Sequence, residues 1–76
     1  MVLSDIPKGV SFKVLKVTQR KELGRRLADM GFTEGTEGTM IRHSFFRGPL
    51  QVRIRGYNVL IRRIEAAGIE VEQLGN

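Results

Sequence analysis

The sequence contains no cysteine and no long apolar segment, and each absence excludes a class of protein. Without cysteine, the 76 residues cannot form disulfides, thiolate zinc sites or cysteine-held iron–sulfur clusters. No stretch approaches the roughly 18 apolar residues that span a bilayer, and Met1–Asp5 lacks the charged and apolar regions of a signal peptide. We therefore expect a cytoplasmic protein that does not span a membrane and depends on packing and hydrogen bonds for stability.

Side chains suited to catalysis are scarce. The single histidine, His43, cannot form a two-histidine metal site, so any divalent ion would depend on carboxylates or backbone oxygens, and we expect weak metal binding at most and no cofactor. Ser44 adjoins His43, but neighbouring side chains on an extended segment point to opposite faces. Gly31, Gly35 and Gly38 follow a helix and lead into a strand, unlike a phosphate-binding loop. We predict no catalytic residue, and hence a binding protein rather than an enzyme.

Alternation of apolar and polar residues predicts about five short strands. The clearest covers 50–54, with Leu50, Val52 and Ile54 on one face. The first, from residue 10 to 17, changes phase at Val14–Leu15, where a bulge would keep later apolar residues inward. Further strands are expected at 38–43, 59–62 and 69–72, with a tight turn at 56–58.

One helix is predicted over residues 19–30, after the first strand. Thr18 is suited to cap its start, and Gly31 to end it in a left-handed conformation. A short helical turn at 63–68 precedes the last strand. The spacing of four and three residues gives the longer helix a single apolar stripe of Leu23, Leu27 and Met30.

These elements indicate a mainly β protein. Five short strands with one apolar face each bury those faces best by curling into a small barrel. An open sheet with one helix on its face is the alternative.

Two surface features remain for function. The loop from Ser44 to Pro49 holds Phe45, Phe46 and Arg47, and adjacent phenylalanines in a glycine/proline loop cannot easily both turn inward. Leu60 is out of phase with its apolar neighbours. Exposed aromatic residues beside arginine are typical of interface anchors, whereas a ring that caps the end of the barrel is the structural alternative.

Charge is the second feature. The net charge is +5, residues 42–63 contain no acid, and the tail after them contains no base. Arg53 and Arg55 form an outward basic row that could join Arg42 or Arg62, so nucleic-acid binding is the alternative function. We favour it less, because the bases lack interleaved aromatic residues and the tail is acidic.

Two segments resemble the ferrous iron transport protein A family, FeoA. Arg26–Thr36 is similar to that family's "RLxxLGhxxGt" segment, and 49–63 is similar to its "PlxvxvrGyxhxLRxxEA" segment, which Glu65-Ala66 completes. The resemblance extends from Leu3 to Val71, which indicates one domain over residues 1–76 with a core of about 3–72. The chain departs from the family pattern at Gly38, at Leu60 and in the 45–49 loop, which lacks the usual aspartate.

The resemblance implies an SH3-like barrel and a cytosolic accessory role in ferrous iron transport, through protein–protein contact with a FeoB-type membrane GTPase transporter. Transition-metal binding is also ascribed to this family, so the resemblance implies it for this chain. The same domain occurs in metal-dependent repressors. Self-association through the two phenylalanines is a further alternative. The candidate partner-binding residues are Phe45, Phe46, Arg47, Arg53, Arg55 and Leu60.

Overall fold

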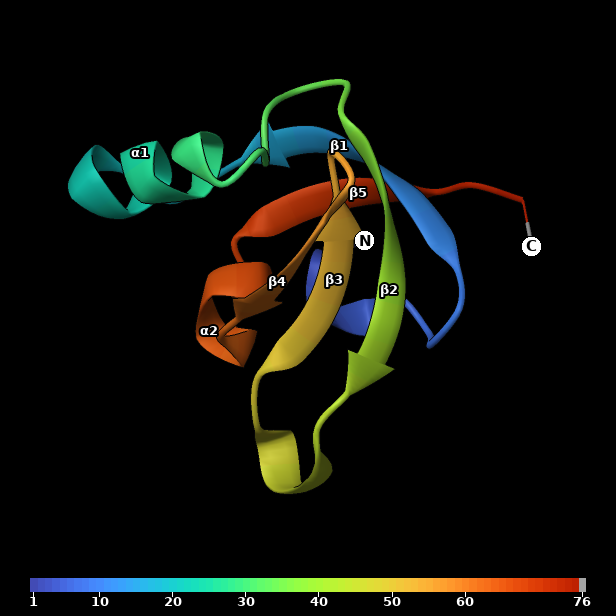
Figure 1. Cartoon of the computed structure of the whole chain (residues 1–76). Coiled ribbons are helices and arrows are strands. Elements are labelled where there is room, and N and C mark those ends of the chain that lie inside the picture. Colours follow the sequence, from blue (N-terminus) through green and yellow to red (C-terminus); the bar gives the residue numbers. More distant parts are fainter. Residues whose placement is uncertain (76) are drawn as a thin grey trace.

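The computed structural model describes residues 1–75, and for Phe45 the backbone alone. Five strands form one antiparallel sheet in the order β4-β3-β2-β1-β5. Along the chain, with short 3-10 helices marked η, the elements are η1 (Leu3–Asp5), β1 (Ser11–Val17), α1 (Lys21–Asp29), β2 (Glu37–His43), η2 (Phe45–Arg47), β3 (Leu50–Ile54), β4 (Tyr57–Ile61), α2 (Arg63–Ala66) and β5 (Ile69–Gln73) (Figure 1).

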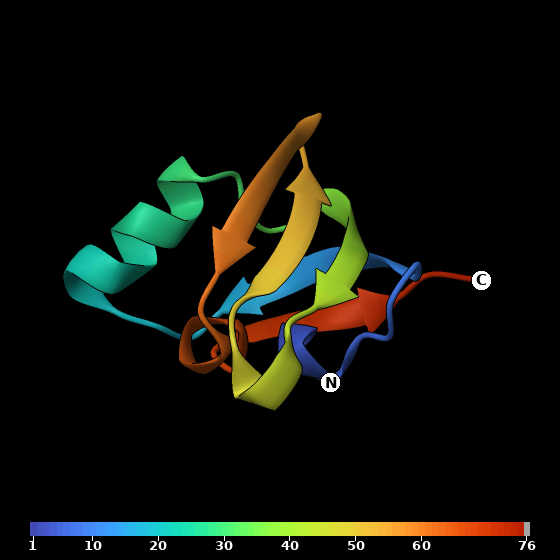
Figure 2. The same ribbon diagram turned by 60° about the horizontal axis from the view of Figure 1, so that its bottom comes forward.

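The sheet curls into the expected small barrel. Strands β2, β3 and β4 lie across β1 and β5, with the apolar residues between the two groups (Figure 2). Helix α1 projects from the side of the barrel instead of covering a face (Figures 1 and 2). The open-sheet alternative is therefore wrong, because the inner faces of the strands bury one another.

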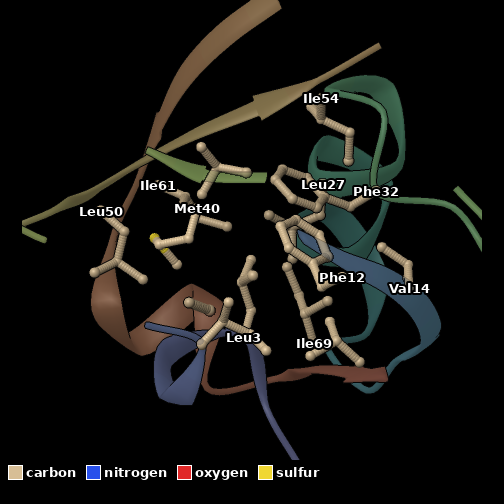
Figure 3. Packing of buried hydrophobic residues seen from close by; sticks show 14 residues of the cluster. Leu3, Phe12, Val14, Leu27, Phe32, Met40, Leu50, Ile54, Ile61 and Ile69 are labelled. Carbon is tan, nitrogen blue, oxygen red and sulfur yellow. The ribbon is translucent and has the colours of Figure 1, made fainter. Parts of the chain in front are cut away.

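The core is a single cluster of fully buried side chains that converge from both groups of strands (Figure 3). Leu50, Val52 and Ile54 of β3 are all buried, as their alternation predicted. The other strand residues in the cluster are Phe12, Val14, Met40, Ile61, Ile69 and Val71.

The predicted bulge in β1 is present, but its effect is not the expected one. The pairing of β1 with β5 shifts register between Val14 and Lys16. Leu15 occupies the shift and is 44% exposed, so it points outward, whereas Val17 is half-buried against the core. The bulge returns only Val17 to the interior, because the residue inserted at the bulge does not pair with the partner strand.

Helix α1 is shorter than predicted and lacks the predicted cap. It begins at Lys21, after the N-cap residue Arg20, and no side chain bonds to its start. The Thr18 hydroxyl lies before this start and donates to the Gly68 carbonyl oxygen at 2.9 Å. Its end is as predicted: Gly31 has a φ of 112°, and the Phe32 amide donates to the Leu27 carbonyl oxygen at 3.0 Å.

The β3–β4 turn lies one residue earlier than predicted. Arg55 and Gly56 occupy it with φ values of 52° and 81°, and Tyr57 already pairs with Ile54. Two consecutive positive φ values in a two-residue hairpin turn are the pattern of a type I′ turn. Arg55 is therefore a turn residue rather than part of an outward row on β3.

The N-terminal segment, for which the sequence predicted no structure, closes the barrel. Leu3 and Ile6 are fully buried in the core. Val2 forms a β-bridge with Glu70, and the Val71 amide donates to the Met1 carbonyl oxygen at 2.9 Å. The outer edge of β5 is therefore covered by the start of the chain.

Candidate partner-binding surface

The loop between β2 and β3 projects at one end of the barrel (Figure 1). Within it, Phe46 is 101% exposed, and Phe46 and Arg47 have φ values of 55° and 62°. A non-glycine residue in this left-handed region costs of order 1 kcal/mol or more, so the loop holds an apolar ring outward at some energetic cost. The side chain of Phe45, which was also predicted to bind a partner, lies outside the described part of the chain.

Leu60 lies at the same end of the β3–β4 hairpin. Leu60 pairs with Gln51, and the next pair along the hairpin is Leu50–Ile61. Leu50 is the first residue of β3 after the loop, so Leu60 lies near the loop end of the hairpin. Leu60 is 65% exposed, and Ile64 in α2, directly after β4, is 75% exposed. Sequence analysis missed Ile64 because a one-turn helix is too short for a periodicity that would separate its faces.

Strand β4 is one edge of the sheet. Within residues 1–75, its backbone pairs only with β3, whereas β5 at the other edge is bridged by Val2. An uncovered strand edge presents unpaired N–H and C=O groups to which another chain can add. Leu60 therefore stands on a strand whose outer edge is open.

The arginines of the nucleic-acid hypothesis do not form one row. Arg53 faces outward from β3, level with Asn58. Arg55 lies in the turn, and a Cβ built on Gly31 would lie 3.3 Å from its Cδ, so its side chain covers the end of α1. Arg62 follows β4 and leads into α2. Of the arginines in this hypothesis, only Arg53 on β3 and Arg42, which pairs with Gln51 from β2, lie on strands.

A buried carboxylate connects the two helices. Glu65 is 4% exposed, and its Oε1 accepts a hydrogen bond from the Arg62 amide at 2.9 Å. Its Oε2 lies 3.6 Å from Nη2 of Arg26 on α1. This pairing positions α2, and with it the exposed Ile64, at the end of β4.

A separate cleft of about 520 Å³ lies beside the end of β2. It is lined by Lys8, Arg42, His43 and Ser44. Of the candidate partner-binding residues whose side chains the structure describes, none belongs to this lining. His43 is half-buried, and its Nε2 donates to the Ile6 carbonyl oxygen at 2.8 Å. Across residues 1–75, no three or more histidine, aspartate or glutamate side chains are grouped to hold a metal ion.

Comparison with known proteins identifies the family. The model of the FeoA domain matches residues 1–73. The chain belongs to the FeoA family. It is 36% identical, over all 76 residues, to the Fe(2+) transport protein A/Fe(2+) transporter FeoB fusion protein of Porphyromonas gingivalis, and spans 9% of that protein.

Solved structures confirm the fold. Iron(II) transport protein A of Clostridium thermocellum matches with a TM-score of 0.93 and 31% identity, over 97% of this chain and 46% of that one. FeoA of Stenotrophomonas maltophilia in complex with zinc, described as a prokaryotic SH3-domain protein, matches with a TM-score of 0.83 and 29% identity, over 95% of this chain and 89% of that one. The FeoA domain described here is thus SH3-like, as the sequence resemblance implied. No helix within residues 1–75 is long and apolar enough to cross a bilayer.

Proposed function

We propose that this FeoA domain is an accessory protein of ferrous iron transport that binds the cytosolic part of a FeoB-type transporter. The observation that carries the proposal is the Porphyromonas gingivalis relative, whose name joins FeoA and FeoB in one chain. A covalent link keeps two modules at a high effective concentration, which favours domains that act on one another. The Stenotrophomonas maltophilia relative, described as a candidate activating factor of ferrous iron transport, supports the same role.

The surface proposed for this contact combines the η2 loop with the end of β4. Phe46 and Leu60 supply exposed apolar area, and Arg47, the residue after Phe46, is an exposed cation. Aromatic and arginine side chains are enriched among the residues that carry most of the binding energy at interfaces. The open edge of β4 adds backbone groups that an extended segment of the partner can pair with.

The test is a titration of the FeoA domain with the soluble GTPase domain of the transporter from the same organism. We expect saturable binding that Phe46→Ser and Leu60→Ser each weaken by about tenfold or more, the loss typical of an interface anchor. Leu15→Ser, at an exposed apolar position on β1, is the matched control and should bind like the wild type. Absence of binding at high micromolar concentration, or equal weakening by all three substitutions, would contradict the proposal.

A further inference from the structure

The cleft beside β2 is built from segments that are far apart in the sequence. Pro7–Val10 forms a tight turn in which the Val10 amide donates to the Pro7 carbonyl oxygen at 3.2 Å, and Gly9 has a φ of 83°. The Gly9 amide in turn donates to the Met40 carbonyl oxygen of β2 at 2.7 Å. Lys8 is therefore held on a short turn tied to β2, next to the residues that end that strand.

A second anchor fixes the same wall of the cleft. Ile6 is fully buried, and its carbonyl oxygen accepts the 2.8 Å hydrogen bond from Nε2 of His43. The N-terminal segment is therefore joined to the end of β2 on both sides of Lys8. After Lys8 the Gly9 amide bonds to Met40, and before it the Ile6 carbonyl oxygen accepts from His43. The backbone of the cleft is thus held by the fold, so that a ligand would need to order only the exposed Lys8 and Arg42 side chains.

The charges in the cleft are not neutralised within the described chain. Lys8 and Arg42 are exposed, and neither forms an ion pair, since the only salt bridge among residues 1–75 joins Arg26 to Glu65. No carboxylate lines the cleft, and Ser44 adds a hydroxyl group. Two cations and neutral hydrogen-bonding groups around one hollow produce a local positive potential that attracts anions and repels metal cations.

We propose that this cleft binds a phosphate group. Arginine and lysine are the side chains that proteins use most to hold phosphate oxygens, arginine through paired N–H donors and lysine as a point charge. A phosphate has enough acceptor oxygens to engage Lys8, Arg42 and the Ser44 hydroxyl together. The volume of about 520 Å³ also admits the molecule that carries the phosphate. The two cations of this site, Lys8 and Arg42, lie outside the η2 loop and β4 that form the proposed FeoB contact, whereas Ser44 borders that loop.

The test is a heteronuclear NMR titration of the ¹⁵N-labelled domain with inorganic phosphate, at constant ionic strength maintained with chloride. We expect saturable shifts centred on the amides of Lys8, Gly9, Arg42, His43 and Ser44. Arg42→Gln should weaken binding by about tenfold, the value of one charge-assisted hydrogen bond, and the double variant with Lys8→Gln should abolish saturation. Arg53→Gln removes another exposed arginine, outside the cleft, and is the matched control.

Parallel titrations distinguish a phospholipid headgroup from a small phosphate compound. Vesicles of phosphatidylcholine with and without phosphatidylglycerol are added to the wild type and the double variant. If vesicles with phosphatidylglycerol remove the cleft signals of the wild type but not those of the double variant, the proposal is supported and the bound phosphate belongs to a lipid headgroup. Saturation by inorganic phosphate with no effect of either vesicle supports it with a small phosphate compound as the source. Non-saturable shifts, or equal binding by the double variant and the wild type, would overturn it.

Discussion

At the scale of single residues, close packing of the backbone restricts what individual positions tolerate. Gly38 lies in β2, opposite Phe12 of β1 and Ile54 of β3. A Cβ built there would lie 2.6 Å from the Arg53 carbonyl oxygen and 2.8 Å from Cζ of Phe12. The Phe12 ring therefore occupies the space that a side chain at position 38 would fill, which explains why this chain has glycine there.

Gly38→Ala is accordingly expected to destabilise the domain. Overpacking against a backbone oxygen cannot be relieved by a rotamer change, so we expect the free energy of unfolding to fall by about 1–3 kcal/mol. Urea denaturation followed by circular dichroism measures it. Gly75→Ala, where a Cβ would meet nothing within 4 Å, is the control and should be neutral. An unchanged midpoint for Gly38→Ala would show that both the Arg53 backbone and the Phe12 ring can move aside, and would contradict the prediction.

Arg55→Asn, in contrast, is expected to stabilise the domain. Arg55 has a φ of 52° at the first central position of the β3–β4 turn, before Gly56, and Asn-Gly is the preferred pair for a type I′ turn. We expect a gain of about 0.5–1 kcal/mol in the free energy of unfolding, since asparagine adopts the left-handed conformation with less strain. Arg53→Asn, at an extended position on β3, should give no gain. A loss for Arg55→Asn would mean that the contact of the Arg55 side chain with Gly31 outweighs the strain.

At the scale of secondary-structure elements, α1 and α2 depend on tertiary contacts. Of the three residues in the predicted stripe of α1, only Leu27 is fully buried, and Met30 packs partly against the core. Helix α2 has a single turn, which is too short to be stable by itself. Glu65 provides the polar contact that joins them, through the Arg62 amide and the Arg26 guanidinium.

Glu65→Ala should therefore cost more than Glu65→Gln. The alanine leaves the Arg62 amide without its acceptor and opens space in a buried site, so we expect a loss of about 2 kcal/mol. The glutamine retains an acceptor oxygen and should cost less. Chemical denaturation gives the energies, and hydrogen exchange at the Arg62 amide should accelerate most in the alanine variant. Glu70→Gln, at an exposed position, should change stability by less than about 0.5 kcal/mol. Equal losses for all three substitutions would contradict this role of Glu65.

At the scale of the whole molecule, the barrel is closed by its N-terminus. Strands β4 and β5 are the two edges of the sheet, and the first residues of the chain pair with β5 while Leu3 and Ile6 fill the core. A domain of this size buries only about 60% of its unfolded surface. Leu3 and Ile6, from a short terminal segment, are two of the fourteen hydrophobic residues in this small core.

Leu3→Ala and Ile6→Ala should each destabilise the domain strongly. Truncation of a buried leucine or isoleucine to alanine costs about 2–5 kcal/mol, a large fraction of the total stability of a small domain. Thermal unfolding followed by circular dichroism measures the loss. Met1→Ala, at a position that is 60% exposed, should leave the midpoint almost unchanged. A loss below about 1 kcal/mol for Leu3→Ala would show that this segment is not an integral part of the core.

The sequence alone determined the order of the five strands and of α1 and α2, because period-two alternation and helix-ending glycine are local signals. Leu50, Val52 and Ile54 are buried as their alternation requires, and Gly31 ends α1 in a left-handed conformation. Family-like segments also indicated the FeoA family, whose model matches residues 1–73. The cap predicted at Thr18 is absent, and local signals could not show this, since the Thr18 hydroxyl bonds to a carbonyl fifty positions away at Gly68.

Only the tertiary structure decided which surface residues lie together. Arg53 and Arg55 are close in the sequence, yet Arg53 is an exposed residue of β3 whereas Arg55 lies in a left-handed turn with its side chain near Gly31. Lys8 and Arg42 are far apart in the sequence, yet they line one cleft. The reason is physical: a strand's inner face follows from its own alternation, whereas neighbours on a surface follow from sheet register and from long-range hydrogen bonds such as that between His43 and Ile6.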